Sequence, residues 1–207
     1  MKSELTTFCA AAALACLAAP AMAQTAPNFT GFSLGADLGA VNSKIDFSPS
    51  AGTDMASTDS ALDLVGSYGF SMGSNWLGTV DLNYSLKNIK FGSVVSSSGV
   101  TSEASVKQHY AVSFAPGYRL GGDGLVYGKV ALHSLVVNYT ATSGIDFSRT
   151  HQGVGVGAGY ATALNNRLTL RAELESVSYN SQQNNNSATA TLAPQQLGLS
   201  ATLLYKF

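Results

Sequence analysis

The sequence predicts an all-β fold: an eight-stranded antiparallel up-and-down transmembrane β-barrel. Apolar residues alternate with small or polar residues at period two in eight segments, the pattern of strands with two unlike faces. Only 11% of the residues are charged, whereas a soluble domain usually carries about 25%. The connections between the segments are alternately short and long, as in barrels that cross a membrane.

Residues 1–23 are predicted to be a cleaved signal peptide. Lys2 precedes an apolar run over residues 8–19, which is too short to cross a bilayer. Ala21-Met22-Ala23 has the small-x-small pattern of a cleavage site; a retained anchor helix is the alternative. Both cysteines, Cys9 and Cys16, lie in this segment, and Cys16 matches a lipoprotein acceptor poorly. We therefore expect an exported single domain over residues 24–207 without disulfides.

The eight segments have nearly the length that a tilted strand needs to cross hydrocarbon, about 9–11 residues. They cover residues 32–40, 62–70, 76–86, 109–120, 126–133, 153–160, 168–175 and 197–207. Long polar loops are expected at about 42–58, 87–106, 140–149 and 180–194, and short turns at 72–75, 121–124 and 164–166. An even number of strands leaves both termini on one side of the membrane.

The distribution of charge indicates which face of each strand meets lipid. A soluble lipocalin-type barrel, apolar inside and polar outside, is the alternative fold, but its outer surface would carry many lysines and glutamates. Here one face of each strand is almost free of charge, and its aromatic residues lie mostly near strand ends, where interfacial girdles belong. The other face is rich in Gly, Ser, Ala and Thr, which suit a crowded barrel interior.

The face assigned to the lumen carries charges of both signs. Its titratable residues are Asp37, Asp63, Asp81, His109, Arg119, Lys129, His133, Arg171, Glu173 and Glu175. Charges inside a narrow barrel must be paired or hydrogen-bonded, so we interpret this set as a structural ion-pair network that fills the lumen. The alternatives are a proton, ion or small-solute path, and a gate that opens when pairs break. Four glycines at 153, 155, 157 and 159 are predicted to make room for bulky luminal neighbours.

The last strand ends in an aromatic residue. Phe207 is preceded by Tyr205 and Leu203 on the same strand face, which resembles the C-terminal assembly signal of bacterial outer-membrane proteins. Together with the eight alternating segments, this chain resembles the small opacity-type, OmpA/OmpX-like barrels. The resemblance covers residues 30–207. It implies export to the outer membrane of a Gram-negative cell, recognition by the barrel-assembly machinery, and contact with outer-membrane lipid and lipopolysaccharide.

These observations favour a monomer that maintains the envelope or contacts a surface ligand through its external loops. A narrow pore for small solutes is the alternative, and a lipid A-modifying enzyme is a third hypothesis. We do not expect an enzyme, because His133 and Ser134 are adjacent and must point to opposite faces. Three dispersed histidines predict no metal site, and no cofactor is expected. The net charge of −1 argues against nucleic acid as a partner.

Overall fold

The computed structural model describes residues 28–48, 55–95, 99–121, 123–144, 146–183 and 191–207. Its strands are β1 (Gly31–Ser48), β2 (Met55–Ser71), β3 (Trp76–Ser85), β4 (Lys90–Val95), β5 (Thr101–Leu120), β6 (Gly124–Ala141), β7 (Asp146–Ala163), β8 (Leu168–Tyr179), β9 (Gln182–Gln183) and β10 (Thr191–Lys206). Among the described residues, no helix has the length and apolar character needed to cross a membrane. The predicted signal peptide lies outside the described residues, so its cleavage remains a prediction.

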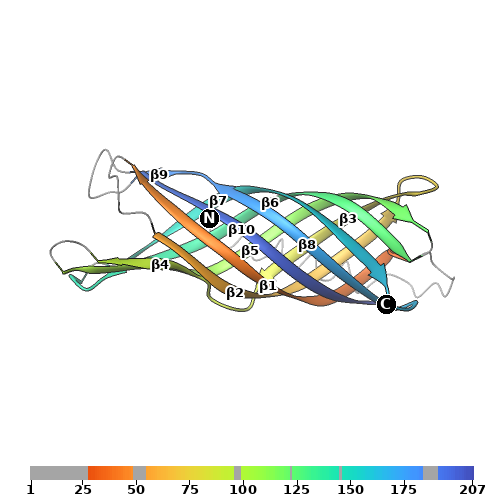
Figure 1. The fold of residues 1–207 in the computed structure, drawn as a ribbon, viewed down its shortest axis with the longest axis horizontal. Helices are drawn as coiled ribbons and strands as arrows, with labels where there is room; N and C mark the ends of the chain where they lie inside the picture. The colour runs from red at the N-terminus through yellow and green to blue at the C-terminus, as the bar shows by residue number, and fades with distance from the viewer. Residues whose placement is uncertain (1–27, 49–54, 96–98, 122, 145, 184–190) are drawn as a thin grey trace, which may run out of the picture.

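The strands close into one antiparallel barrel (Figure 1). Eight strands pair in the order β1-β2-β3-β5-β6-β7-β8-β10, and β10 returns to pair with β1. β4 continues the ladder of β3 along β5, and β9 is a two-residue strand beside β10. The wall therefore has eight strand positions, so the predicted eight-stranded antiparallel up-and-down barrel is confirmed.

The register around the barrel fixes its stagger. Following directly opposed residues once around the wall, from Ser33 on β1, leads back to β1 at Ser43, ten residues further along the chain. The path runs through Ser67, Asp81, Ser113, Ala131, Gly155, Val177 and Gln196. Such a displacement is required to close tilted strands into a barrel, typically at 35–45° to the axis, and the oblique strands are visible in Figure 1.

The strands are longer than the sequence pattern predicts, and the expected long loops are correspondingly shorter. β1 continues to Ser48 and β2 begins at Met55, so most of the loop predicted at 42–58 is barrel wall. Most of the loop predicted at 87–106 consists of β4 and the first residues of β5. We call this end of the barrel the loop end. The opposite end, which holds the short turns and the C-terminus, is the turn end.

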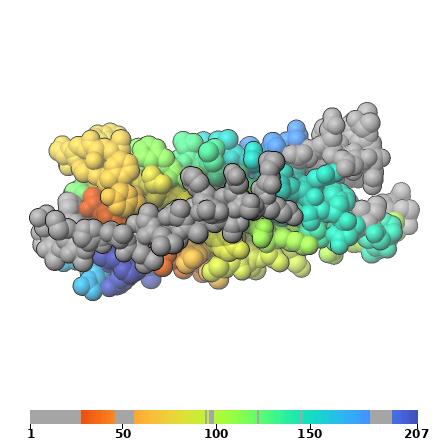
Figure 2. Space-filling model, turned by 180° about the vertical axis from the view of Figure 1, so that it is seen from behind, coloured from red at the N-terminus to blue at the C-terminus, as the bar shows by residue number. Residues whose placement is uncertain are grey.

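Around the middle of the barrel and towards the turn end, the outer face forms an apolar belt. Its exposed residues include Leu38, Leu82, Val112, Val156 and Leu199. Aromatic residues lie on the same face at both edges of the belt: Trp76, Tyr118, Tyr160 and Tyr205 towards the turn end, and Tyr84 and Tyr110 towards the loop end. The space-filling view shows the elongated body from behind (Figure 2). The apolar face to which the sequence analysis assigns lipid contact is therefore the outer face of the barrel.

Towards the loop end, the polarity of the two faces reverses. The outer face there carries polar exposed residues such as Asn42, Thr58, Gln152 and Ser178. The inner face carries an apolar cluster, which we call the loop-end core: Ile45, Ala61, Ile89, Phe91, Ala104, Val106, Leu135, Val137, Tyr139, Val177 and Tyr179. A second cluster at the other end, the turn-end core, comprises Leu77, Ala115, Leu125, Tyr127 and Ala161. Both clusters lie inside the barrel and pack across it.

Candidate functional site: the luminal polar network

The polar side chains of the lumen lie between the loop-end core and the turn-end core. The site is built on period two, because alternate residues of every strand face inward. All ten titratable residues assigned to the lumen from sequence are on inward-facing positions, and none of them is classed as exposed. Nine of them line two adjoining cavities of about 80 and 60 Å³: Asp37, Asp63, Asp81, His109, Lys129, His133, Arg171, Glu173 and Glu175.

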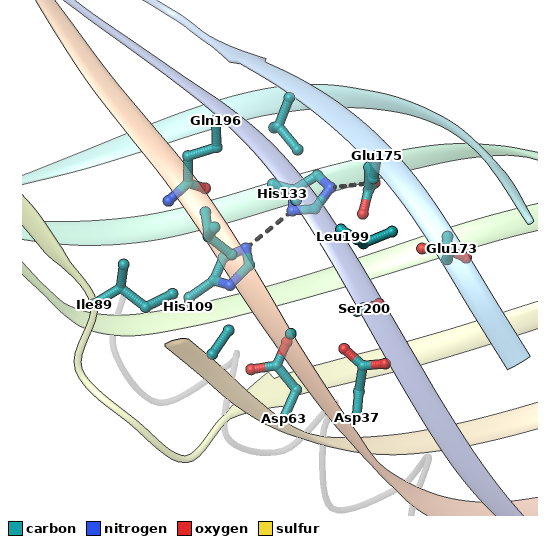
Figure 3. Close-up of a pocket in the computed structure, with 15 residues that line it drawn as sticks. Asp37, Asp63, Ile89, His109, His133, Glu173, Glu175, Gln196, Leu199 and Ser200 are labelled. Atoms are coloured by element: carbon teal, nitrogen blue, oxygen red, sulfur yellow. Dashed lines mark hydrogen bonds and ion pairs between the residues drawn. The ribbon is translucent and has the colours of Figure 1, made fainter. Parts of the chain in front are cut away.

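One continuous chain of hydrogen bonds begins at Asp63 and crosses the lumen. The Ser85 hydroxyl lies 2.6 Å from Asp63 Oδ1 and 3.1 Å from His109 Nδ1. His109 Nε2 lies 2.9 Å from His133 Nδ1. His133 Nε2 is 2.9 Å from Glu175 Oε1. Figure 3 shows the two imidazoles side by side, with dashed lines joining His109 to His133 and His133 to Glu175.

Lys129 continues this chain on the side of β8. Its ammonium group donates to Glu173 Oε1 at 2.5 Å and to Glu175 Oε2 at 2.9 Å. The Tyr127 hydroxyl donates to the second oxygen of Glu173 at 3.1 Å. The Lys129 side chain is only 7% exposed. One buried cation therefore compensates two carboxylates, and each of the four carboxylate oxygens makes a hydrogen-bond contact.

A separate ion pair crosses the full width of the barrel. Arg171 on β8 donates from Nη1 to Asp81 Oδ2 on β3 at 2.9 Å. These two strands are four positions apart in the eight-position wall and so lie on opposite sides of the lumen. Asp81 Oδ1 and Arg171 Nε are buried and have no hydrogen-bond partner among the described residues. The pair thus joins opposite sides of the lumen, and one polar atom of each partner is left without a described hydrogen bond.

Two of the predicted luminal residues stand apart from these networks. Asp37 lies directly opposite Asp63 in the register of β1 and β2, and its Oδ1 accepts a hydrogen bond from the Thr202 hydroxyl at 2.5 Å. Arg119 lies near the turn end and donates to the backbone oxygen of Asn28 at 3.1 Å. The structure therefore assembles most, but not all, of the predicted set into one cluster.

The glycines of β7 provide the space that the large luminal side chains occupy. A Cβ at position 155 would overlap Glu175 and His133, a Cβ at 159 would overlap the Tyr127 ring, and one at 153 would overlap Tyr179. The side chains of Glu175, His133, Tyr127 and Tyr179 therefore pack directly against the backbone of β7. The predicted role of these glycines in making room agrees with this packing.

Three partners in the site were not singled out from sequence: Ser85, Tyr127 and Thr202. Each bonds a luminal carboxylate. The period-two pattern marks all three as inward-facing. Ser85 shares a strand face with Asp81 and Tyr127 shares one with Lys129, whereas Thr202 lies on the polar face of the last strand. The pattern does not reveal which carboxylate each hydroxyl reaches, because that depends on the stagger of the closed barrel.

The contacts of the third histidine, His151, bear on the hypothesis of a lipid A-modifying enzyme. His151 is fully buried; its Nε2 lies 3.2 Å from the Tyr139 hydroxyl and its Nδ1 lies 3.2 Å from the Asn180 backbone oxygen. Ser148, a candidate nucleophile three residues before His151, donates its hydroxyl hydrogen to Asn138 Oδ1, and the described contacts do not join it to His151. Within the described part of the chain, no three His, Asp or Glu side chains are grouped to hold a metal ion.

The residues of the predicted assembly signal lie on the outer face at the turn end. Leu203, Tyr205 and Phe207 are 47%, 41% and 74% exposed. The Phe207 ring stacks on Phe32 with centroids 5.8 Å apart and meets Tyr205 edge-on at 5.3 Å. The terminal aromatic side chain thus covers the seam where β10 closes on β1.

Comparison with known proteins identifies a protein family and solved structures that share this architecture. The outer membrane protein beta-barrel domain family matches residues 9–207. No curated protein sequence matches the chain significantly. Similar solved structures include Neisserial surface protein A (18% identity, TM-score 0.55, 86% of this chain and 98% of that chain covered) and OprG from Pseudomonas aeruginosa (14%, 0.51, 87% and 98%). At these identities the likeness concerns the fold alone. Because the family match spans nearly the whole length, this chain belongs to the outer membrane protein β-barrel domain family.

Proposed function

We propose that this protein is a closed, non-catalytic outer-membrane barrel that acts through the surface it presents outside the membrane, either by contacting a ligand or by supporting the envelope. The observation that carries the proposal is the reversal of polarity at the loop end. There the wall is polar outside and apolar inside, as in a water-soluble barrel. A wall of this kind is suited to water rather than to hydrocarbon, and it would project from the lipid as a rigid stalk.

The loop-end core supports the view that the barrel is not a pore. Ile45, Phe91, Leu135 and Val137 have no accessible surface in the barrel interior. Below this core, the Arg171–Asp81 pair crosses the lumen. The two cavities of about 80 and 60 Å³ compare with about 30 Å³ for one water molecule in the liquid. They offer room for a few waters but not for a continuous water-filled path.

Two partner assignments follow from the outer face. The apolar belt suits the hydrocarbon of the outer membrane, and the polar wall above it suits the lipopolysaccharide layer. Phe207, at the end of β10, is proposed to be read by the barrel-assembly machinery during insertion. We propose that the barrel functions as a monomer, because β10 pairs with β1 and this closure removes the sheet edges to which a second copy could add a strand within the belt.

Planar-bilayer recording tests the absence of conduction. The purified barrel should give no current steps, whereas a porin added to the same bilayer gives them. Reproducible steps from the wild-type barrel would favour the narrow-pore alternative.

Complementation of a deletion strain tests the role of the outer surface. Two variants separate the surface from the lumen: one carries Thr150→Glu, Gln152→Glu and Ser178→Glu on the outer polar wall, and the other carries Arg171→Met with Asp81→Leu in the lumen. We expect detergent sensitivity or surface binding to change with the first variant and not with the second, at equal protein levels. The opposite pattern would contradict a surface role.

A further inference from the structure

The hydrogen bonds between Asp63 and Glu175 require a definite number of protons. Four contacts join five groups in sequence: Asp63 to Ser85, Ser85 to His109, His109 to His133, and His133 to Glu175. Each contact needs one hydrogen between its two heavy atoms. The two imidazole rings are nearly parallel, with an interplanar angle of 8°, and both nitrogens of each ring are engaged.

The usual protonation states supply one hydrogen too few. The Ser85 hydroxyl carries one hydrogen, each neutral imidazole carries one, and ionised carboxylates carry none. These three hydrogens cannot fill the four contacts. In at least one place, two lone pairs would face each other at hydrogen-bonding distance in a buried site, which is strongly unfavourable.

We propose that the folded barrel binds one additional proton in this chain of five groups, which we call the luminal relay. With that proton, every contact is satisfied. The proton can be assigned to Asp63, His109, His133 or Glu175, because reversing the hydrogen bonds in turn moves it along the relay without breaking any contact. The ligand of this site is thus a single proton shared between β2 and β8.

The surrounding charges are compatible with an added proton. Asp37 is directly opposite Asp63, and like charges opposed across two strands are destabilising. On the far side, Lys129 bonds both Glu173 and Glu175. The edge of the Tyr179 ring faces His133 at 6.2 Å, and Asp81 and Arg171 line the adjoining cavity. With neutral histidines, the five carboxylates around the two cavities exceed the cations Lys129 and Arg171, so one bound proton reduces a negative excess.

His151 provides an internal contrast. Its Nδ1–H can donate to the Asn180 oxygen while its Nε2 accepts from the Tyr139 hydroxyl. Both contacts are satisfied by a neutral ring, so His151 needs no additional proton.

The proton requirement can be measured as a pH dependence of unfolding. Above about pH 7.5 an unfolded chain has neutral histidines and ionised carboxylates, because their ordinary pKa values are about 6.5 and 4. The folded relay then holds one proton more than the unfolded chain. Stability must fall as the pH rises, and the unfolding constant should increase about tenfold per pH unit. Measurements below pH 9 avoid ionising the tyrosines of the unfolded chain.

Three variants separate the relay from the rest of the lumen. Asp63→Asn supplies its own N–H to Ser85, and Ser85→Ala leaves two contacts that two neutral histidines can fill. Both variants should lose the pH dependence between pH 7.5 and 9. Asp37→Asn is the matched control, because Asp37 faces the same cavities but bonds Thr202 rather than the relay, and it should keep the tenfold change.

Urea unfolding of the full barrel in lipid vesicles provides these constants. A flat wild-type profile, or a full slope in Asp63→Asn, would overturn the proposal. A second measurement does not depend on the variants folding: nitrogen NMR of labelled histidines and infrared spectroscopy of carboxyl groups, both at pH 8. We expect three N–H protons on the two relay rings, or two N–H protons and one protonated carboxyl. Two N–H protons without a protonated carboxyl would refute it.

Discussion

The ion pair across the lumen gives a quantitative test of the closed barrel. Arg171 and Asp81 have side chains only 8% and 3% exposed. Arg171→Met keeps most of the side-chain volume and removes the charge, which leaves Asp81 with no described hydrogen-bond donor. Asp81→Leu leaves the buried guanidinium without its carboxylate. Removing one member of a buried pair costs about 3–5 kcal/mol, because the other charge remains in a poorly solvating site.

The double variant is expected to behave differently from the two single variants. If the effects were independent, Arg171→Met with Asp81→Leu would lose about 6–10 kcal/mol, the sum of two uncompensated charges. Because apolar replacement of a whole buried pair is often neutral or stabilising, we expect a loss below about 3 kcal/mol. Each wild-type partner also has one buried polar atom that forms no hydrogen bond with the described residues, so the double variant removes both of these atoms as well.

Urea unfolding in vesicles measures this double-mutant cycle. The single tryptophan, Trp76, is 52% exposed on the apolar belt, so its fluorescence reports the removal of β3 from lipid. Wild type, both single variants and the double variant are compared at one pH and one lipid composition. Additive losses of unfolding free energy would refute the inference that the two charges stabilise each other. They would also contradict the assignment of Arg171 and Asp81 as an ion pair across the lumen.

Three further predictions test the packing, the belt and the assembly signal. Gly159→Ala should lower the unfolding free energy by about 1–3 kcal/mol, because the added Cβ overlaps the Tyr127 ring. Gly66→Ala is the control and should cost much less, because nothing lies within 4 Å of its added Cβ. Equal losses in the two variants would contradict the packing argument. Val156→Arg, in the apolar belt, should lower the unfolding free energy by about 2–4 kcal/mol, whereas Gln152→Arg on the same strand face should lower it by less than about 1 kcal/mol. Equal losses would mean that the belt does not end between these two residues. Deleting Phe207 should lower the amount of barrel in the outer membrane of cells, measured by fractionation, while leaving refolding of the purified chain unchanged; normal levels in cells would contradict the proposed assembly signal.

The strand faces could be predicted from sequence because alternation is a local property. Within the belt, inward and exposed residues alternate, so that residues of one face recur at a fixed spacing of two; the inward positions of Asp81, Lys129 and Arg171 therefore follow from counting. Their partners do not follow from counting. Arg171 meets Asp81 on the opposite side of the lumen, 90 residues away in the chain, because the closed wall returns to β1 ten residues out of step. That stagger is a property of the whole barrel.

The ends of the strands were harder to predict, for two reasons. Near the loop end the apolar residues change to the inner face, so segments such as 101–109 and 135–141 lose the pattern that marks lipid-facing strands. In addition, the pairing of β5 with β6 shifts between Val106 and Gln108. This bulge places both Lys107 and Gln108 on the exposed side, as bulges redirect side chains. A strict period of two carried through Lys107 therefore assigns Val106 to the wrong face.

The reversal of polarity along the barrel wall helps to fix the register in which the strands pair. A shift of one residue in the pairing of a strand moves every side chain to the other face. In the belt, such a shift would place charged side chains such as Glu173 in hydrocarbon. The loss of stability is about 2–4 kcal/mol for a basic residue at the midplane of the bilayer and smaller for an acidic residue. At the loop end, the same shift would expose Ile45 or Val137 to water, at about 1.5–3 kcal/mol for each large apolar side chain. The two halves have opposite patterns, yet both oppose the same error, so the reversed loop end reinforces the register of the belt.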